Sequence, residues 1–211
     1  MALNHYTKVY DNFLSDNVCD QYVRCFEETM VKDRAEVIDT SICYGKEVGA
    51  AGQPICGNCN CQRMNPMGFD RFIPLNKIAL NQFLDVVDRY IKDVDLHKSQ
   101  WPVNYGYEEF RMKRFLVSDG GPDSEQFKDH VDVTSHEGGK RFLIMMVYLN
   151  DDFEGGETVF PVLGDTITPK KGRLLLFPPT WNYLHHGNPP LKPGYAKYFL
   201  MTYLNYTDMQ K

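Results

Sequence analysis

The chain has 211 residues, of which 43% are hydrophobic and 24% charged, and its net charge is -5 at pH 7. This composition is ordinary for a packed globular protein and far from that of disordered or fibrous chains. A net negative chain has no general attraction for nucleic acid or for an anionic membrane surface, so we expect neither as a partner. The length suits one domain.

The sequence also bears on location. No apolar run approaches the roughly 20 residues that a membrane-spanning helix needs. The first residues lack the basic and apolar regions of a signal peptide. Six cysteines in a chain of this size are too few for a disulfide scaffold. We therefore expect a cytoplasmic protein with reduced thiols, and the sequence leaves its oligomeric state open.

Two amphipathic helices are predicted in the first half of the chain. Ser15 is a suitable helix cap, and the apolar residues after it recur at helical spacing: Val18, Tyr22, Phe26 and Met30. The same spacing indicates a second helix through Leu80, Phe83, Leu84, Val87 and Ile91. Between the two, the segment 45–74 is rich in Gly, Asn, Cys and Pro, which favours a long loop.

From residue 108 onward the pattern changes to short apolar or alternating runs separated by turn residues. These runs cover residues 110–117, 141–149, 157–160, 173–177 and 196–206. Short strands at such spacing are typical of an antiparallel sandwich or barrel. We predict a mainly β, α+β fold in a single domain, 1–211: a double-stranded β-helix (jelly-roll) barrel over 107–206, with supporting helices and the cysteine-rich loop in 1–106.

His130 and Asp132 are two positions apart, and on an extended chain such residues point to the same side. Both could bind one metal ion, with a third ligand from His185 or His186 on a distant strand. Two histidines and one carboxylate leave coordination positions open, as non-haem Fe(II) oxygenases require. Structural zinc prefers a closed four-ligand site. A His-x-Asp pair that stands alone is more often a solvated loop pair.

A longer series of motifs surrounds these residues. It runs through Phe127-Lys-Asp-His130-Val-Asp132, Tyr148-Leu-Asn-Asp151, Gly155-Gly-Glu-Thr158, Gly172-Arg173, Phe177-Pro178, His185-His-Gly-Asn-Pro189 and Lys197-Tyr198. In order and spacing the series resembles the prolyl 4-hydroxylase-like Fe(II)- and 2-oxoglutarate-dependent dioxygenases. The segment 9–15, followed by a helix, is also similar to the beginning of these proteins.

The resemblance implies three catalytic residues that bind Fe(II): His130, Asp132 and His185. His185 is preferred over His186 because its distance to the following proline fits the family pattern better. Adjacent residues on an extended chain face opposite ways, so only one of the two should bind the metal. His186 would then face outward or support a ligand.

The resemblance also implies how the cosubstrate is bound. Lys197 occupies the place of the basic residue that binds the far carboxylate of 2-oxoglutarate. It shares a predicted apolar face, where a buried ammonium needs an anionic partner; a snorkelling surface lysine is the alternative. Tyr148 and Thr158 are expected in the same pocket, although both could be ordinary strand residues. Phe115 stands where the family often has a tyrosine, so one cosubstrate hydrogen bond is expected to be absent.

The implied activity is hydroxylation of prolyl residues in a peptide or protein, coupled to oxidative decarboxylation of 2-oxoglutarate to succinate and CO₂. The implied cofactors are Fe(II), 2-oxoglutarate and O₂, with room for ascorbate as a further one. One alternative is the same chemistry on a non-prolyl residue or a small metabolite. Another is a catalytically silent jelly-roll binding module. Such a module should have lost a ligand or the basic residue, and all four are in place.

Three cysteines, Cys56, Cys59 and Cys61, lie close together in the loop. Closely spaced thiols suit a structural zinc ion, although a second Cys-x-x-Cys pair is missing. A redox pair and ordinary reduced thiols are the other interpretations. By resemblance to prolyl hydroxylases, the segment 45–74 could also act as a lid over the substrate.

Overall fold

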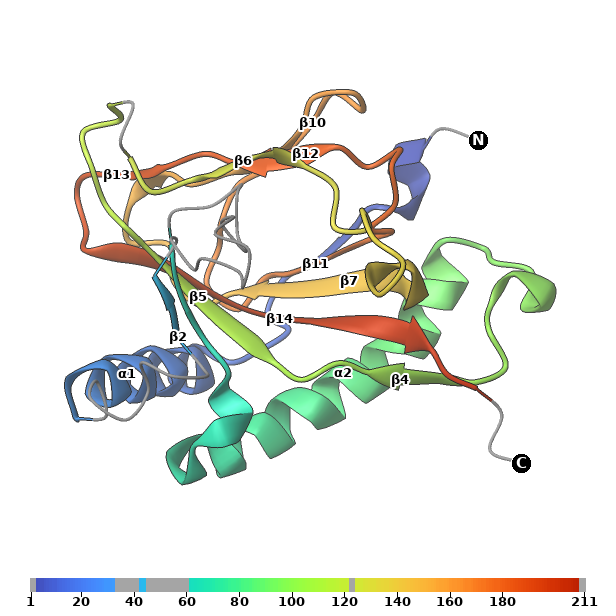
Figure 1. The fold of residues 1–211 in the computed structure, drawn as a ribbon, viewed down its shortest axis with the longest axis horizontal. Coiled ribbons are helices and arrows are strands. Elements are labelled where there is room, and N and C mark those ends of the chain that lie inside the picture. Colours follow the sequence, from blue (N-terminus) through green and yellow to red (C-terminus); the bar gives the residue numbers. More distant parts are fainter. Residues whose placement is uncertain (1–2, 33–41, 45–60, 122–123, 209–211) are drawn as a thin grey trace.

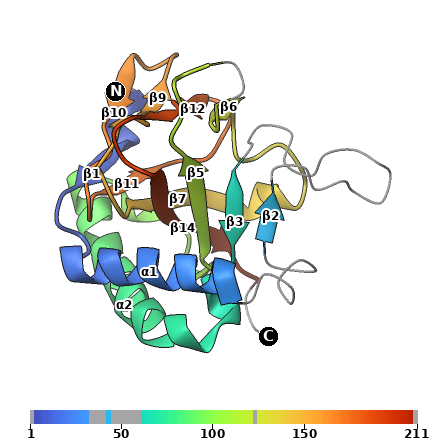
Figure 2. The ribbon, with the colours of Figure 1, turned by 90° about the vertical axis from the view of Figure 1, so that its left-hand side faces the viewer.

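The computed structural model describes residues 3–32, 42–44, 61–121 and 124–208. Its strands form an eight-stranded, a four-stranded and a two-stranded sheet. Figure 1 shows the two larger sheets facing each other, with the helices α1 (Asp16–Lys32) and α2 (Ile73–Asp93) on the outer side of the large sheet. The perpendicular view in Figure 2 shows the same succession of layers.

The large sheet has the strand order β1, β11, β7, β14, β5, β3, β2, with β4 also paired to β14. The bounds are β1 (Lys8–Tyr10), β2 (Ile42–Tyr44), β3 (Gln62–Met64), β4 (Tyr105–Tyr107), β5 (Arg111–Leu116), β7 (Arg141–Tyr148), β11 (Leu174–Phe177) and β14 (Ala196–Tyr206). The N-terminal half thus supplies strands as well as helices, since β1 pairs with β11 and β3 with β5.

The four-stranded sheet has the order β10, β9, β12, β6. Its strands are β6 (Phe127–His130), β9 (Thr158–Phe160), β10 (Asp165–Ile167) and β12 (His185–Gly187), and the two-stranded sheet pairs β8 (Glu154–Gly155) with β13 (Pro190–Leu191). Short 3-10 helices lie at η1 (Leu3–Tyr6), η3 (Pro66–Gly68), η4 (Asp70–Phe72), η5 (Lys98–Gln100) and η6 (Gly138–Lys140). Paired strands in both larger sheets run antiparallel, which confirms the prediction of a mainly antiparallel β protein with two helices.

The first helix agrees with its prediction. The Ser15 hydroxyl accepts a hydrogen bond from the backbone N–H of Val18 at 3.4 Å, as a cap residue does. The predicted apolar face is buried against the large sheet: Val18, Tyr22, Phe26 and Met30. The spacing of apolar residues was therefore sufficient to identify both the helix and its buried side.

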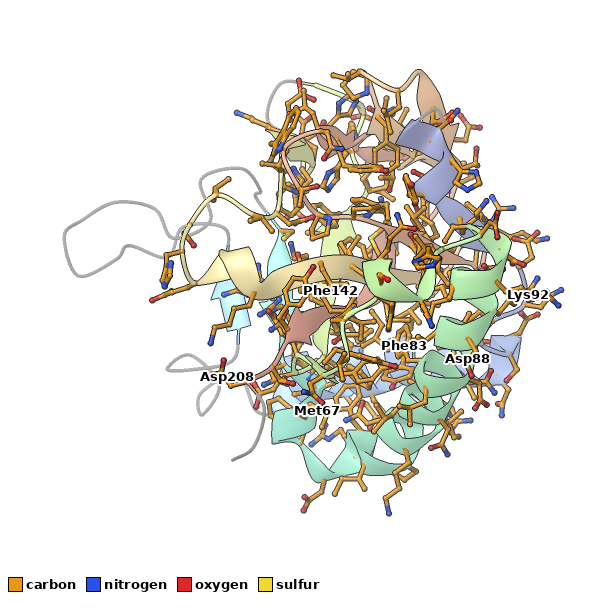
Figure 3. The ribbon with its side chains drawn as sticks, turned by 90° about the vertical axis from the view of Figure 1, so that its right-hand side faces the viewer. Met67, Phe83, Asp88, Lys92, Phe142 and Asp208 are labelled. Atoms are coloured by element: carbon orange, nitrogen blue, oxygen red, sulfur yellow. The ribbon has the colours of Figure 1, made fainter. Side chains whose placement is uncertain are left out.

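The second helix is longer than predicted, and its buried face is rotated. It begins at Ile73, with a proline in the first turn, where the missing N–H has no helical partner to lose. Leu80 and Leu84, expected to be buried, are 37% and 50% exposed. The buried side instead runs through Leu75, Asn76, Ala79, Phe83, Val86, Val87 and Tyr90. Figure 3 shows Phe83 within the core, whereas Asp88 and Lys92 lie at the surface.

The long strand β14 separates two hydrophobic cores. Because side chains alternate along a strand, Tyr198, Leu200 and Leu204 pack toward the helices, whereas Phe199 and Met201 pack toward the four-stranded sheet. Both faces are therefore buried, and each buried Leu stabilises the fold by about 1.5–3 kcal/mol. No helix of the described segments is long and apolar enough to cross a membrane.

The predicted cysteine site falls mostly outside the described residues. Cys56, Cys59 and the segment 45–60 of the predicted lid are not among them. Cys61 is described and is buried at the start of β3. The described remainder of the predicted loop holds β3, η3, η4 and the beginning of α2.

Candidate metal centre

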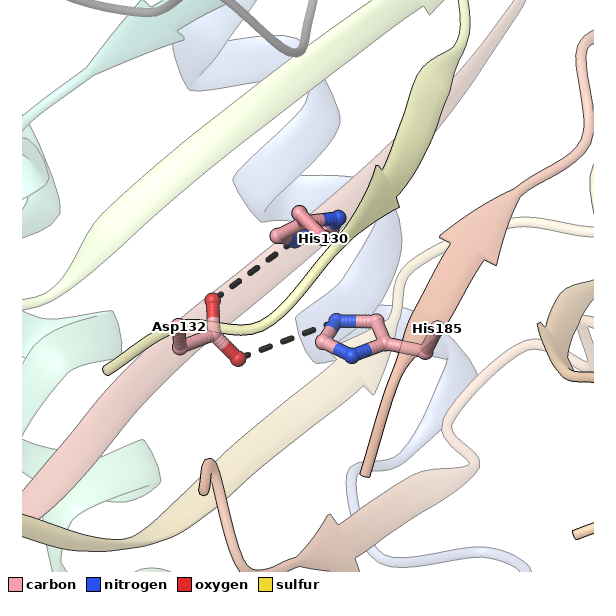
Figure 4. Close-up of side chains that lie close together, drawn as sticks. All are labelled: His130, Asp132 and His185. Atoms are coloured by element: carbon pink, nitrogen blue, oxygen red, sulfur yellow. Dashed lines mark ion pairs between the residues drawn. The ribbon is translucent and has the colours of Figure 1, made fainter. Parts of the chain in front are cut away.

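Three predicted ligands meet between the two larger sheets. His130 ends β6, Asp132 follows it in the chain, and His185 begins β12 directly opposite His130 in the antiparallel pair. Directly opposite residues project from the same face, so the two imidazoles lie side by side. Their Nε2 atoms each lie 3.7 Å from one Asp132 oxygen, as Figure 4 shows. All three donor atoms lie within 4.8 Å of one another, so one ion could contact all of them.

Backbone carbonyls orient both imidazoles. His130 Nδ1 donates to the Lys128 carbonyl at 2.8 Å, and His185 Nδ1 donates to the Tyr183 carbonyl at 2.9 Å. A carbonyl can only accept, so each Nδ1 carries the proton and each Nε2 lone pair is free to bind a metal. Burial and the neighbouring His185 lower the pKa of His130 to about 4, although Asp132 opposes the shift. The ring is therefore neutral near pH 7, as a ligand must be.

Asp132 has one satisfied and one unsatisfied oxygen. Its Oδ1 accepts a hydrogen bond from the Tyr203 hydroxyl at 2.9 Å. Its Oδ2 is buried without a hydrogen-bond partner among the described residues, which is unfavourable for a carboxylate. A cation between the three donors would supply the missing interaction. Two neutral imidazoles and one carboxylate are the donors that non-haem Fe(II) sites use, so the residues fit this metal.

Tyr203 is itself held by a partly buried ion pair. The guanidinium of Arg141 lies 4.1 Å from the centre of the Tyr203 ring, and its Nε donates to Glu108 at 2.6 Å. Burial and the nearby Asp132 carboxylate raise the pKa of Tyr203 well above its usual value. The hydroxyl therefore remains a donor, and it holds Asp132 in an orientation that places Oδ1 beside His130 and Oδ2 beside His185.

The two adjacent histidines have different surroundings. The only three-donor group found in the described part of the chain contains His185. His186 pairs with Val159 on β9, and its Nδ1 lies 2.7 Å from Asp129 Oδ1 in a partly exposed ion pair. Its alternation with His185 along β12 directs its ring away from Asp132.

A cavity opens between the sheets beside the three donors. It is lined by Lys113, Phe115, Phe127, His130, Asp132, Ile144, Met146, Thr158, Phe177, His185, His186, Gly187, Asn188, Lys197, Phe199 and Met201. Most of these side chains are apolar or aromatic, and the charged groups are few. A mostly apolar cavity with a few converging polar groups is the usual form of a ligand site.

Lys197 lies on the wall of this cavity and is 3% exposed. Its ammonium donates to the Gly156 carbonyl at 2.5 Å, across a turn where Gly156 has a φ of +70° that favours glycine. No carboxylate of the described residues forms an ion pair with it. Burial lowers the pKa of Lys197 to about 7; Glu157 opposes the shift and Lys113 adds to it. A bound anion would supply the partner that this lysine lacks.

The other predicted pocket residues also lie together. Thr158 lines the cavity, and its Oγ1 lies 2.6 Å from the hydroxyl of Tyr148, which is fully buried behind it. Phe115 lines the cavity without a hydroxyl, and its ring stacks on Phe199 with the centres 5.8 Å apart. The geometry therefore connects Tyr148 to the cavity through Thr158.

Three residues of the site were not identified from the sequence: Lys113, Phe127 and Tyr203. A signal was present for two of them, because even spacing along a strand places two residues on the same face. Lys113 therefore shares a face with Phe115, and Tyr203 shares one with Lys197. The Phe127 ring stacks on His130 with the centres 3.9 Å apart, a contact within β6 that simple alternation along a strand does not predict. Only the paired strands show that these residues share a cavity.

Comparison with known proteins agrees with this geometry. Residues 115–205 match the family model of the 2OG-Fe(II) oxygenase superfamily. Prolyl 4-hydroxylase 1 of Arabidopsis thaliana is 36% identical over 26% of this chain and 24% of its own length. The matches to curated relatives span about a quarter of those proteins.

Solved structures share the fold at low identity. The viral collagen prolyl hydroxylase of Paramecium bursaria Chlorella virus-1, in its 2OG complex, has a TM-score of 0.63 at 20% identity, over 96% of this chain and 97% of its own. A Trichoplax adhaerens prolyl hydroxylase with a peptide fragment of hypoxia-inducible factor has a TM-score of 0.63 at 16% identity, over 95% and 84%. A Pseudomonas putida prolyl-4-hydroxylase has a TM-score of 0.56 at 16% identity, over 97% and 94%. Residues 115–205 of this chain are thus similar to the 2OG-Fe(II) oxygenase superfamily, whose model they match, and the three solved structures share the fold.

Proposed function

We propose that this chain is an Fe(II)- and 2-oxoglutarate-dependent hydroxylase that acts on prolyl residues of a peptide or protein. One observation carries the proposal: two imidazole Nε2 atoms that are oriented to bind a metal each lie 3.7 Å from an oxygen of Asp132, and its buried Oδ2 has no hydrogen-bond partner among the described residues. The superfamily match over 115–205 supports the same chemistry.

Each site residue has a role in this proposal. His130, Asp132 and His185 hold Fe(II), and Lys197 binds the far carboxylate of 2-oxoglutarate, with Thr158 beside it. When bound, the iron supplies O₂ activation coupled to the conversion of 2-oxoglutarate into succinate and CO₂. The apolar cavity walls exclude water and hold the reacting groups in fixed positions. The proposal leaves room for ascorbate as a further cofactor.

The fold supports the proposal. We infer that the two facing sheets are the halves of a double-stranded β-helix, or jelly roll, in a single domain of residues 1–211. The shared fold of three prolyl hydroxylases, over nearly the whole chain, supports this inference. One of them holds a peptide fragment, which favours a peptide or protein substrate here as well.

The test of the cofactor site is spectroscopic. Purified protein is mixed with Fe(II) and 2-oxoglutarate without oxygen, and a visible metal-to-ligand charge-transfer band is expected. The band should disappear in His130→Ala and His185→Ala and persist in His186→Ala and in His136→Ala, a histidine exposed on a loop. If folded, metal-loaded wild type gives no band, the catalytic proposal is wrong and the binding module becomes the better hypothesis.

A second experiment tests the substrate. Succinate formation from 2-oxoglutarate is compared with proline-containing peptides, free proline, other amino acids and nucleosides. Stimulation by proline peptides is expected, with the product heavier by one oxygen atom. Stimulation only by a non-prolyl compound would retain the oxygenase chemistry and reject the prolyl substrate.

A further inference from the structure

A second buried lysine lines the same cavity. Lys113, on β5, is 7% exposed and lies opposite Phe199 in the register of β5 and β14. Lys197 lies opposite Phe115, so the two lysines are diagonal neighbours on one face of the sheet, within reach of each other's long side chains. The cavity wall therefore carries two ammonium groups.

Lys113 has no anionic partner among the described residues. Its Nζ lies over two aromatic rings, 4.0 Å from the centre of the Phe127 ring and 5.9 Å from the centre of the Phe199 ring. A cation–π contact recovers less free energy than the burial of an unpaired ion costs. The aromatic rings thus offset only part of the burial of this charge.

Neither nearby carboxylate of the described residues forms an ion pair with Lys113. Asp132 receives the Tyr203 hydroxyl and faces the histidines, and Glu157 accepts a hydrogen bond from Asn188 at 3.0 Å. Lys113 itself disfavours the charged form of Lys197 and contributes to its lowered pKa. A single carboxylate bound at Lys197 would therefore leave the positive charge of Lys113 unpaired.

Phe127 separates Lys113 from the metal ligands. The His130 ring stacks on Phe127 with the centres 3.9 Å apart and the planes 18° apart, and Lys113 Nζ lies 4.0 Å from the same centre. Two groups this close to the centre of one ring must occupy opposite faces. The Lys113 ammonium therefore faces a part of the cavity that the Phe127 ring separates from the metal donors.

We propose that Lys113 is a second carboxylate-binding group of this cavity, additional to Lys197. The carboxylate belongs to the substrate, as an acidic side chain beside the target residue or the α-carboxylate of a free amino acid, or to the cosubstrate. Because Phe127 separates Lys113 from the metal donors, we favour the substrate as the source of this carboxylate. This inference rests on the proposed function and adds a substrate class to it: substrates with a carboxylate near the reacting carbon.

Three variants isolate the charge of Lys113. Lys113→Met removes the charge and keeps the length, whereas Lys113→Arg keeps the charge. Lys128→Met is the matched control, because Lys128 follows Phe127 on β6 and its side chain is exposed. Replacing an unpaired buried cation by an apolar side chain is often neutral or stabilising, so Lys113→Met should fold, as thermal unfolding will check.

The experiment measures binding without turnover. Mn(II)-loaded protein is titrated calorimetrically, under anaerobic conditions, first with 2-oxoglutarate. With 2-oxoglutarate bound, it is then titrated with free proline and with two capped peptides that differ only by Glu or Gln beside the proline. In wild type we expect about tenfold tighter binding of the Glu peptide, the size of a partly desolvated charge pair. Lys113→Met should lose this preference, while Lys113→Arg and Lys128→Met keep it.

The outcomes separate the two sources of the carboxylate. If Lys113→Met instead weakens 2-oxoglutarate binding about tenfold and leaves the peptides unchanged, the carboxylate is that of the cosubstrate. If neither 2-oxoglutarate, proline nor peptide affinity depends on Lys113, the proposal is wrong. Wild type that binds no 2-oxoglutarate would contradict the proposed function, and the peptide and proline titrations, run without cosubstrate, would still decide the role of Lys113.

Discussion

The two faces of the large sheet use the same strands for different purposes. The face toward α1 and α2 is an apolar core in which Met112, Val147 and Leu200 are completely buried. The face toward the four-stranded sheet is equally enclosed, yet it contains Lys113 and Lys197, whose charges have no anionic partner among the described residues. Burial is similar on both sides, so burial does not distinguish a core from a site.

The difference lies in how far the buried groups are satisfied. On the helix side, the buried Arg114 pairs with a carboxylate of α1, Glu27, and the buried Asn76 accepts from Tyr22 and donates to a backbone carbonyl. On the cavity side, among the described residues, Asp132 Oδ2 has no hydrogen-bond partner and two ammonium groups have no anionic partner. Such groups lower stability unless a ligand is bound, so they mark the face where function outweighs stability. Changes on the two faces should therefore have opposite effects on stability.

The largest effect is expected at Lys197. Lys197→Met should weaken 2-oxoglutarate binding by about 2–5 kcal/mol or more, because the carboxylate would be buried without its cation. The same variant should be more stable than wild type at pH 7 without ligand, since the folded-state pKa of Lys197 is about 7, below its ordinary value. Below pH 7 Lys197 is charged in the folded protein, which then bears the whole cost of burying that charge. Between pH 7 and the pKa of Lys197 in the unfolded state, the stability of the wild type rises with pH.

Calorimetry and denaturant unfolding measure the two consequences for Lys197→Met. Weaker binding together with lower stability would mean that Lys197 is a structural residue. Lys192→Met, at an exposed lysine paired with Asp119, is the matched control and should change neither quantity appreciably.

Leu200 tests the other face of the same strand. Leu200→Ala should lower the free energy of unfolding by about 2–5 kcal/mol, because it removes a completely buried side chain and leaves a cavity. Its 2-oxoglutarate affinity should remain that of wild type wherever the variant is folded. Denaturant unfolding measures the loss, and Leu84→Ala, on the exposed side of α2, should change stability by less than about 0.5 kcal/mol. A large loss of cosubstrate affinity in folded Leu200→Ala would contradict the separation of the two faces.

Tyr203 tests the support of the metal centre. Tyr203→Phe should weaken metal binding about 10- to 100-fold, because Asp132 loses the hydrogen bond that orients it. Metal titration under anaerobic conditions measures the change. Tyr206→Phe, at an exposed tyrosine of the same strand, is the control. Unchanged metal affinity in Tyr203→Phe would show that the hydroxyl serves only packing.

The smallest effect is the pH dependence of cosubstrate binding. In the free protein Lys197 loses its proton near pH 7, and a carboxylate bound beside it would keep it charged. Binding then takes up a proton, so affinity should fall above pH 7 by at most about tenfold per pH unit and be level just below it. Glu157 and Lys113 are the charged groups that shift this midpoint. Calorimetry from pH 6 to 9 tests this expectation, and Lys197→Arg, which stays charged, should lack the decline.

Several features were readable in the sequence because they depend on local spacing. The apolar residues of α1 predicted its buried face, and five short apolar or alternating runs predicted strands of the two larger sheets. The second helix shows the limit of such reading. It has more apolar residues than its buried face can hold, including Leu80 and Leu84. Only packing against the sheet decides that Phe83 and Val87 are the buried ones.

By itself, the sequence determined the mainly β architecture and the pair of donors on one side of an extended segment, His130 and Asp132. These follow from the period of two along a strand, which any reader of the chain can count. Only the tertiary structure decided that His185 lies opposite His130, that Tyr203 holds Asp132 and that Lys113 shares the cavity with Lys197. Such contacts depend on the register between strands distant in the chain, and a shift of one residue would turn every side chain to the other face.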